Sequence, residues 1–464
     1  MNLAIIILAA GHGKRMRSHM PKVLQPVGGK PMLWHVVEQA KKLAPDSISI
    51  VYGHGGDQVR QSLPDAGLNW YPQAERLGTG HAVAQALPGI DTGATVLVLY
   101  GDVPLITQVT LQRMLPALEK HAISLLSVRL ADPRGYGRII RDDNEQVRGI
   151  VEEHDASPAQ RDVREVNTGI LAARAHDFQR WLPRIGADNA QGEYYLTDCI
   201  RLAVESGGRV RAEECADPDE VMGVNDKCQL AVVERAYQRR LAAEFMRQGV
   251  TVLDPARLDI RGQVIAGCDV TVDINVIFEG EVKLGEGVRV GANCVIRDTA
   301  IGARTTILPN SVIEDAHIGA DCRVGPFARI RPHTLLADTA RVGNFVEIKA
   351  SEIGAGSKIN HLSYIGDTAM GAGTNVGAGT IVCNYDGAYK HRTQIGNDVF
   401  IGSDTQLVAP VSVGDGATIG AGSTITRDAP AGALTLSPTR QTVVKGWQRP
   451  RKAGTRDSGP GTRD

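Results

Sequence analysis

"IGNDVFIGSDTQLVAPVSVGDGATIGAGSTI", residues 395 to 425, decides the fold of the second half of this chain. An aliphatic side chain returns at every sixth position, at Ile395, Ile401, Leu407, Val413, Ile419 and Ile425. A period of six fits neither an α-helix nor an alternating strand. It is typical of a hexapeptide β-helix, in which one aliphatic residue of each short strand points inward. A loose all-β domain would not keep these positions in phase.

The same period is present earlier in the chain. It connects Val264, Val270, Val276, Val282 and Val288, and then Val312, Ile318, Val324 and Ile330. With about three hexapeptides per coil, the region predicts roughly nine or ten coils stacked ~4.8 Å apart. The repeat stops at "CNYDGAYKHRTQ", residues 383 to 394, which predicts a loop leaving the solenoid, a common place for binding groups.

The first half alternates strand and helix patterns. Strands are expected at 3–8, 47–52, 95–99 and 123–128. Pro31 opens a helical pattern whose apolar face contains Leu33, Val36, Val37, Ala40 and Leu43. A second helix fits 111–120, where Pro116 would kink or shorten it. This order predicts a parallel sheet with helices on both faces and ligands at the carboxyl ends of its strands.

The domain organisation follows from these two patterns. We expect an α/β domain over 1–225, a linker helix over 226–248, a β-helix over 249–450 and a disordered polar tail over 451–464.

Composition narrows the function classes. The 464 residues carry a formal net charge of −1, so no basic bias points to nucleic acid or a membrane surface. The seven cysteines form no CxxC pair, which suits a reducing compartment. No run reaches ~20 apolar residues, and the short apolar N-terminus lacks the basic region of a signal peptide. We expect a cytoplasmic protein without a membrane span.

The stretch "LAAGHGKRM", residues 8 to 16, predicts a phosphate site. It is not a dinucleotide fingerprint, which needs glycine at Met16, nor a P-loop, because Arg15 follows Lys14. Glycines let backbone N–H groups approach a ligand, and the cations neutralise phosphate oxygens. The bland alternative is a flexible surface turn, but no acidic residue precedes Glu38.

Three further residues are candidates for chemistry. Asp102 in "LVLYGDVPL" follows a predicted strand, where a carboxylate can hold Mg²⁺, although a turn or helix cap is an equal alternative. Asn225 in "GVNDK" reads as a helix cap unless something ties it to Asp102. His361 interrupts the coil pattern, and an imidazole that titrates near neutrality can take a proton from an attacking amine. Its alternative is a structural histidine; Arg331 and Lys349, 18 residues or about one coil apart, favour a site for an anionic substrate.

A series of motifs carries a family resemblance that covers nearly the whole chain. They are "LAAGHGKRM…PKVL", "VYGHGGD", "QAERLGTGHA", "LYGDVPL", "GYGRI", "VNTGI", "QGEYYLTD", "VGNFVEIK", "GAGTIVCNYDG" and "VFIGSDTQLVAPV". In this order they resemble the bifunctional bacterial enzymes that make UDP-N-acetylglucosamine for peptidoglycan and lipopolysaccharide synthesis. These enzymes join an N-acetylglucosamine-1-phosphate uridylyltransferase to a glucosamine-1-phosphate N-acetyltransferase. The implied fold is α/β plus all-β: a Rossmann-like nucleotidyltransferase domain, a connecting helix and a left-handed parallel β-helix of hexapeptide repeats.

The resemblance implies a role for each matching residue of the first half. Arg15 and Lys22 would contact the phosphates of UTP, and Asp102 and Asn225 would ligate Mg²⁺. The uridine nucleotide would lie against Leu8, Ala9, Ala10, Gly11, Gln73, Gly78, Thr79, Tyr100 and Gly101. The N-acetylglucosamine moiety would contact Gly137, Glu152 and Asn167.

In the second half, the resemblance implies that His361 is the general base. Glucosamine 1-phosphate would be held by Arg331, Lys349, Tyr364 and Asn375, with Asn384 and Tyr385 joining from the loop. Acetyl-coenzyme A would lie along Ala378, Asn384, Tyr385, Ser403, Ala421 and Arg440. A homotrimer is implied as well.

Two positions depart from the family pattern. Lys14 replaces a small polar residue, and Pro438 replaces an arginine that serves the coenzyme, a role that Arg440 would take over. Two alternatives stay open at this point. The β-helix could be an oligomerisation scaffold beside an active uridylyltransferase, which acetyl transfer would exclude. The chain could instead be a sugar-nucleotide sensor, which magnesium-dependent pyrophosphate release would exclude.

Overall fold

The computed structural model describes residues 2–11, 13–53, 55–64, 67–437 and 441–449. By its internal contacts the chain divides into two compact units, one ending at Asp315 and the other beginning at Ala316. The tail predicted to be disordered, 451–464, lies outside the described residues, as do Pro438 and Arg440. Among the described helices, none has the length and apolar character that a membrane crossing requires.

The N-terminal part of the first unit is built on a nine-stranded sheet with strand order β11-β7-β10-β6-β1-β4-β5, and β8 and β9 extend it beside β10. Its strands are β1 Leu3–Ala9, β4 Ser47–Tyr52, β5 Leu68–Pro72, β6 Thr95–Tyr100, β7 Ile123–Arg129, β8 Arg138–Arg141, β9 Val147–Val151, β10 Glu165–Arg174 and β11 Val210–Glu214. A separate small hairpin joins β2 Pro26–Val27 to β3 Lys30–Pro31. The four strands expected from the sequence are all present.

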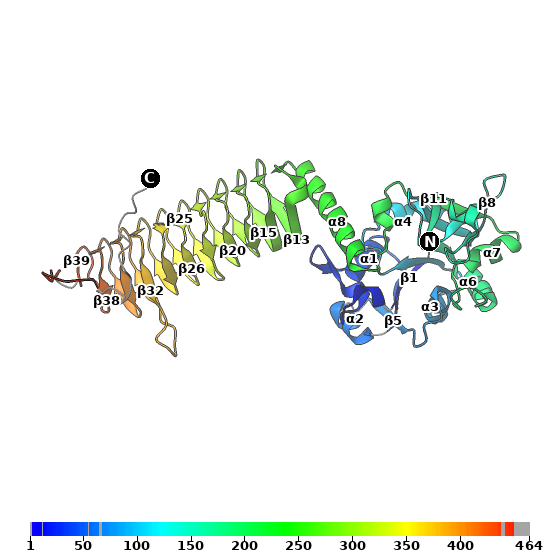
Figure 1. Cartoon of the computed structure of the whole chain (residues 1–464), viewed down its shortest axis with the longest axis horizontal. Helices are drawn as coiled ribbons and strands as arrows, with labels where there is room; N and C mark the ends of the chain where they lie inside the picture. Colours follow the sequence, from blue (N-terminus) through cyan, green and yellow to red (C-terminus); the bar gives the residue numbers. More distant parts are fainter. Residues whose placement is uncertain (1, 12, 54, 65–66, 438–440, 450–464) are drawn as a thin grey trace, which may run out of the picture. The chain divides into compact units, whose positions relative to one another are not determined.

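Helices cover both faces of this sheet, and β1 shows why. Ile5 and Ile7 belong to one apolar cluster with helices α1, α2 and α4, whereas Ile6 belongs to a second cluster with α3, α6 and α7. Alternate side chains of a strand point to opposite faces, so a continuous apolar run places one strand against two helical layers (Figure 1). The helices are α1 Met32–Lys41, α2 Gly56–Ser62, α3 Thr79–Ala86, α4 Gln108–Met114, α5 Pro158–Arg161, α6 Ala175–Trp181, α7 Asp198–Glu205 and α8 Lys227–Arg247.

The expectation of an entirely parallel sheet is wrong at two strands, β9 and β10. β10 runs antiparallel to both β6 and β7. It follows the hairpin of β8 and β9, to which it is also paired through β8. A short turn can join only antiparallel strands, as it does between β8 and β9.

Two predicted helices end earlier than expected. The first stops at Lys41, so Leu43 follows it without belonging to it. The second, α4, ends at Met114 and continues as a 3₁₀ turn, Leu115–Glu119, with Pro116 in its first turn. Proline lacks the N–H that an α-helix interior requires, which explains the change.

The long helix expected at 226–247 is α8, and it is more than a connector. Asp226 caps its first turn by accepting from the Gln229 N–H at 2.8 Å. Glu234 accepts from the backbone N–H of Gly28 at 2.8 Å, and Gln238 donates to the carbonyl of Ile260 at 2.9 Å. α8 therefore packs against both the α/β layer and the first β-helix coil within this unit.

Both units contain β-helix coils made of short parallel strands (Figure 1). In the first unit they are β12 Thr251–Val252, β13 Leu258–Ala266, β14 Thr271–Val272, β15 Val276–Leu284, β16 Arg289–Val290, β17 Val295–Arg297, β18 Ala300–Ile301, β19 Thr306–Ile307 and β20 Val312–Glu314. In the second unit they are β21 Ala316–Ile318, β22 Arg323–Val324, β23 Arg329–Ile330, β24 Thr334–Leu336, β25 Arg341–Asn344, β26 Glu347–Lys349, β27 Glu352–Ile353, β28 Lys358–His361, β29 Tyr364–Gly366, β30 Thr368–Met370, β31 Asn375–Val376, β32 Ile381–Cys383, β33 Thr393–Ile395, β34 Phe400–Ile401, β35 Gln406–Val408, β36 Val411–Val413, β37 Thr418–Ile419, β38 Thr424–Ile425 and β39 Leu434–Thr435.

The six-residue period marks the inward positions with two exceptions. All six aliphatic residues from Ile395 to Ile425 are buried. Val264 and Val312 are only half-buried, and beside the latter Ile313 is the buried residue. The six-residue period shifts by one residue at Val312. The position of a residue within the coil decides whether its side chain points inward, and an exact spacing of six does not.

Candidate functional site

A cavity of about 520 Å³ lies at the carboxyl ends of β1, β5 and β6. Ten predicted nucleotide-site residues line it: Leu8, Ala9, Ala10, Gly11, Lys22, Gln73, Gly78, Thr79, Tyr100 and Asp102. Residues separated by up to 94 positions therefore meet where an open α/β sheet presents its ligands.

The glycine-rich loop is attached to the fold through Met16. This side chain is 1% exposed and packs in a small cluster with Val27, Met32 and Val224. The residue that rules out a dinucleotide fingerprint is therefore an apolar anchor. Lys14 lines the cavity, whereas Arg15 is exposed and does not line it.

Asp102 and Asn225 meet at one cation. The Lys22 ammonium forms an ion pair with Asp102 Oδ2 and donates to Asn225 Oδ1 at 3.2 Å. The backbone holds them together, because the Val224 N–H donates to the Asp102 carbonyl at 3.0 Å. The shared ammonium and this backbone hydrogen bond connect Asn225 to Asp102, a connection that the sequence around Asn225 did not predict.

Two oxygen donors that converge on one positive charge fit a hard divalent cation. Mg²⁺ is commonly bound by one or two protein carboxylates together with substrate phosphates. Within the described residues, no group of three or more His, Cys, Asp or Glu side chains is placed to hold a metal ion. Asp102 and Asn225 therefore supply two oxygen donors of a kind that fits such a cation.

A short hydrogen-bonded network forms the wall of the cavity around α3. Gln73 donates to the carbonyl of Gly78 at 3.1 Å, and Thr79 Oγ1 accepts from the Leu196 N–H at 3.0 Å. Gly78 has φ +109°, and a Cβ there would lie 2.6 Å from the Tyr194 carbonyl oxygen. Only glycine fits this close approach.

Of the predicted sugar residues, Gly137 directly precedes β8, Glu152 directly follows β9 and Asn167 lies on β10. The Asn167 N–H donates to the Gly137 carbonyl at 2.8 Å, and a Cβ on Gly137 would lie 3.1 Å from Glu152 Oε2. A register shift between Asn167 and Leu171 marks a bulge at this point, which re-aims side chains. The three predicted residues are therefore neighbours.

Burial raises the pKa of two groups here, Glu152 and Tyr100. It raises the pKa of Glu152 above its ordinary value, while a hydrogen bond from Thr197 at 3.0 Å opposes that shift. Burial also raises the pKa of Tyr100, with the charges of Glu152 and Asp102 adding to it. Tyr100 stays neutral and can donate its phenol proton at physiological pH.

In the second unit, His361 ends β28 and is exposed. Its Nδ1 lies 3.1 Å from Asn344 Oδ1, the residue that faces it one coil earlier. When Nδ1–H donates to that oxygen, the lone pair is on Nε2, which faces no described hydrogen-bond partner. Asn375 lies on the neighbouring strand, where it faces Lys358.

A second group of predicted residues consists of Lys349 on β26, Tyr364 on β29 and Asn384, which follows β32. A corner at Leu362 and Ser363 separates this group from His361. Lys349 lies beside Lys390 of the loop, and this contact, partial burial and Arg331 lower the pKa of Lys349, while Asp367 opposes the shift. Arg331 pairs with Glu347 at 2.7 Å. Arg331, Lys349 and Lys390 outnumber the carboxylates of Glu347 and Asp367, and such a group of cations suits an anionic ligand.

The predicted loop does leave the coil, between β32 and β33 (Figure 1). Asn384 at its base donates to Asp367 and, at 3.4 Å, to Tyr364 Oη. Tyr385 pairs with Lys390 in a short antiparallel bridge. The loop closes on itself, and its base joins the group around Lys349.

Three of the predicted coenzyme residues form a column along the β-helix. The Asp404 N–H donates to the Ala378 carbonyl at 2.7 Å, and the Gly422 N–H donates to the Ser403 carbonyl at 2.8 Å, so Ala378, Ser403 and Ala421 occupy equivalent places in successive coils. Arg440 lies outside the described residues.

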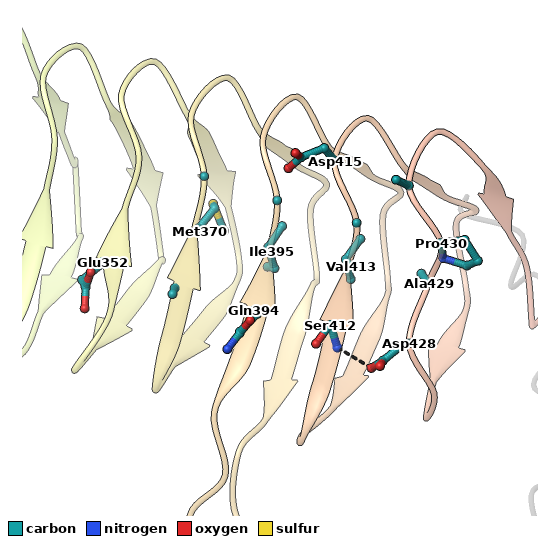
Figure 2. Close-up of a pocket in the computed structure, with 15 residues that line it drawn as sticks. Glu352, Met370, Gln394, Ile395, Ser412, Val413, Asp415, Asp428, Ala429 and Pro430 are labelled. Atoms are coloured by element: carbon teal, nitrogen blue, oxygen red, sulfur yellow. Dashed lines mark hydrogen bonds between the residues drawn. The ribbon is translucent and has the colours of Figure 1, made fainter.

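A second cavity, of about 710 Å³, lies on the outer face of this unit. Figure 2 shows Glu352 on β27, Gln394 on β33 and Ser412 on β36, with β30 between the first two strands, and the Ser412 N–H donating to Asp428 at 2.8 Å. None of the predicted acetyltransferase residues lines it.

Four residues beside the predicted sites had no role assigned to them. Arg76 and Glu193 line the nucleotide cavity, Asn344 contacts His361, and Lys390 contacts Lys349. Asn344 precedes His361 by 17 residues, one coil, which is a signal that the period contains. Arg76 and Glu193 depend on long-range folding and had no such signal.

Family models match three parts of the chain. A MobA-like NTP transferase domain matches residues 5–160, a GMPPB C-terminal domain matches 260–353, and six bacterial transferase hexapeptide repeats match 392–427. The matches agree with a nucleotidyltransferase fold followed by a hexapeptide β-helix.

Curated relatives match the chain over nearly its whole length, and each is named "Bifunctional protein GlmU". The one from Alkalilimnicola ehrlichii is 55% identical over 457 residues, which covers 98% of each chain. The one from Aromatoleum aromaticum is 55% identical over 454 residues, 97% of this chain and all of that protein. The one from Marinobacter nauticus is 53% identical over 451 residues, 97% and 99% of the two chains.

Proposed function

The chain belongs to the family of the bifunctional GlmU proteins and is both an acetyltransferase and a uridylyltransferase, and we propose that the two groups of residues described above are its two active sites. The N-terminal group transfers UMP from UTP to N-acetylglucosamine 1-phosphate. The group on the β-helix acetylates glucosamine 1-phosphate with acetyl-coenzyme A.

In the N-terminal site, an oxygen of the sugar phosphate attacks the α-phosphorus of UTP and pyrophosphate leaves. Such a transfer depends on positioning and on neutralising phosphate charge. Lys14 and Lys22 bring positive charge to the cavity wall, and we expect the exposed Arg15, which follows Lys14 in the chain, to add a further cation for the phosphates. Gly137, Glu152, Asn167 and Tyr100 would bind the sugar hydroxyl groups.

Asp102 and Asn225 would hold Mg²⁺. Their convergence on one ammonium is the observation that supports this site best, because residues 123 positions apart share a cation only if the fold brings their oxygens together. When bound, the metal would neutralise charge on the phosphates.

On the β-helix, His361 acts as general base. With its Nδ1–H donated to Asn344, its Nε2 takes the proton from the substrate amine as the nitrogen attacks the thioester carbon and the thiolate of coenzyme A leaves. Arg331 and Lys349 bind the sugar phosphate, and Tyr364 and Asn384 orient the sugar.

A homotrimer in the cytoplasm is part of this proposal. It is supported by an apolar corner beside His361, where Phe327, Phe345 and Leu362 are 48%, 56% and 60% exposed on successive coils. The two phenylalanine rings stack at 5.2 Å. An exposed apolar patch of this kind is typical of a protein interface, and light scattering on the purified chain measures the assembly directly.

Reciprocal variants test the two-site assignment. We expect His361→Ala to abolish release of coenzyme A thiol in the presence of glucosamine 1-phosphate and to spare pyrophosphate release from UTP. Asp102→Ala should do the reverse. His317→Ala, which removes another exposed histidine from a β-helix strand, is the matched control and should spare both. Loss of both reactions in one folded variant would refute the assignment.

A further inference from the structure

Lys22 lies between the two side chains that the proposed function assigns to a divalent cation. Its ammonium pairs with Asp102 Oδ2 and donates to Asn225 Oδ1 at 3.2 Å. The side chains of Lys22 and Asp102 are only 10% and 17% exposed, so little water competes for this pair. A protein cation already uses the oxygens that Mg²⁺ would need.

The two cations exclude each other at these oxygens. Mg²⁺ takes oxygen ligands at about 2.1 Å in a nearly octahedral arrangement. An ammonium on the same oxygens occupies their lone pairs, and its charge repels the divalent ion. Lys22 must leave before Asp102 and Asn225 can bind metal.

The Lys22 side chain can move without unfolding the loop. The neighbouring Val23 is buried and anchors the backbone. A Cβ on Gly13 would lie 2.8 Å from Lys22 Cβ, so glycine at this position leaves room for the stem of Lys22, whereas a Cβ on Gly11 would lie at an ordinary contact distance of 3.7 Å from Lys22 Cε. Lys22 also lines the nucleotide cavity beside Lys14, where phosphate oxygens can accept its ammonium.

We propose that Lys22 is a built-in counter-ion of the free enzyme, which occupies the divalent-cation site and moves to the nucleotide phosphates when they arrive. The free enzyme then binds divalent cations weakly, and phosphates strengthen that binding by drawing the ammonium away. The inference rests on the proposed function, since it requires Asp102 and Asn225 to be the metal ligands.

Binding of Mn²⁺ to the full-length protein without nucleotide tests the proposal, with electron paramagnetic resonance measuring the free ion. Lys22→Met keeps the length and apolar stem of the side chain and removes its charge. We expect this variant to bind Mn²⁺ at least about tenfold more tightly than the wild type, although it loses uridylyl transfer. A thermal unfolding curve that matches the wild type in both units reports that the variant is folded.

Two controls separate the possible outcomes. Lys14→Met removes a charge from the same cavity without touching Asp102, and it should change Mn²⁺ affinity by no more than about threefold. An equal gain in Mn²⁺ affinity in both variants would show that the lysines act only by general charge repulsion, and it would overturn the proposal. An unchanged Mn²⁺ affinity in Lys22→Met would also overturn it. Tight binding that survives Asp102→Asn in the Lys22→Met background would instead refute the metal site of the proposed function.

Discussion

Replacing Gly366 with alanine should slow acetyl transfer without unfolding the β-helix. Gly366 ends β29 beside the group formed by Lys349, Tyr364 and Asn384. Its φ is outside the left-handed region, so the backbone accepts alanine. The new methyl group would therefore act on its neighbours rather than on the chain itself.

The displacement follows from the distances. A Cβ at this position would lie 2.5 Å from Tyr364 Oη and 2.7 Å from Asn384 Nδ2, whereas ordinary contact begins at 3.4 Å. The hydroxyl must retreat by about 0.9 Å (3.4 − 2.5) and the amide by about 0.7 Å (3.4 − 2.7). A misplacement of about 1 Å costs about 10²-fold in rate, which is about 2.7 kcal/mol in activation free energy.

The assay is kcat/KM for thiol release from acetyl-coenzyme A at varied glucosamine 1-phosphate. Uridylyl transfer by the same preparation should be unchanged, and so should thermal unfolding, because both displaced atoms are at the ends of side chains. Gly149→Ala, at a strand position with nothing within 4 Å, is a control for the added methyl group. A folded Gly366→Ala protein within about threefold of wild-type kcat/KM would refute a positioning role for Tyr364 and Asn384.

Three further outcomes are expected. Met16→Ala leaves a buried cavity, so the free energy of unfolding should fall by about 2–5 kcal/mol in denaturant titrations. The rate of uridylyl transfer should fall more than the rate of acetyl transfer. An equal loss of both would contradict the role of Met16 as the anchor of the glycine-rich loop. Because burial raises the pKa of Glu152, the folded state binds more protons than the unfolded state above the ordinary value of 4.5. Stability is therefore lost as pH rises through that window, and Glu152→Gln should flatten the dependence in unfolding measured from pH 4 to 8; an unchanged slope would argue against burial as the cause. Lys390→Ala removes the main cause that lowers the pKa of Lys349, so the pKa of Lys349 should rise. Labelling of Lys349 by an amine-specific reagent, measured by mass spectrometry, should then require a higher pH. An unshifted labelling curve would show that the two amines do not interact.

The β-helix could be predicted from the sequence because its stabilising contacts join residues that are close together in the chain. Each coil contacts mainly its neighbours, so the inward position recurs with a fixed period that is visible without any knowledge of the fold. The same holds for the loop that interrupts the period and for β1, whose continuous apolar run needs two helical layers. The spacing of Asn344 and His361 by one coil belongs to this class as well.

The antiparallel β10 and the contacts of α8 could not be predicted in this way. A single strand pattern is the same whether its neighbour is parallel or antiparallel, and the direction depends on the connection that precedes it. The surface that α8 buries against Gly28 and Ile260 likewise depends on elements far away in the sequence.

The sequence by itself determined the repeat, the order of strands and helices, and which residue types were available for phosphate, metal and proton chemistry. Only the tertiary structure decided which of them meet. It placed Met16 in the core while leaving Arg15 exposed, and it brought Asp102 and Asn225 to the ammonium of Lys22. Such contacts join residues 80 and 203 positions apart, and no local period or propensity reports on pairs that only the packed sheet brings together.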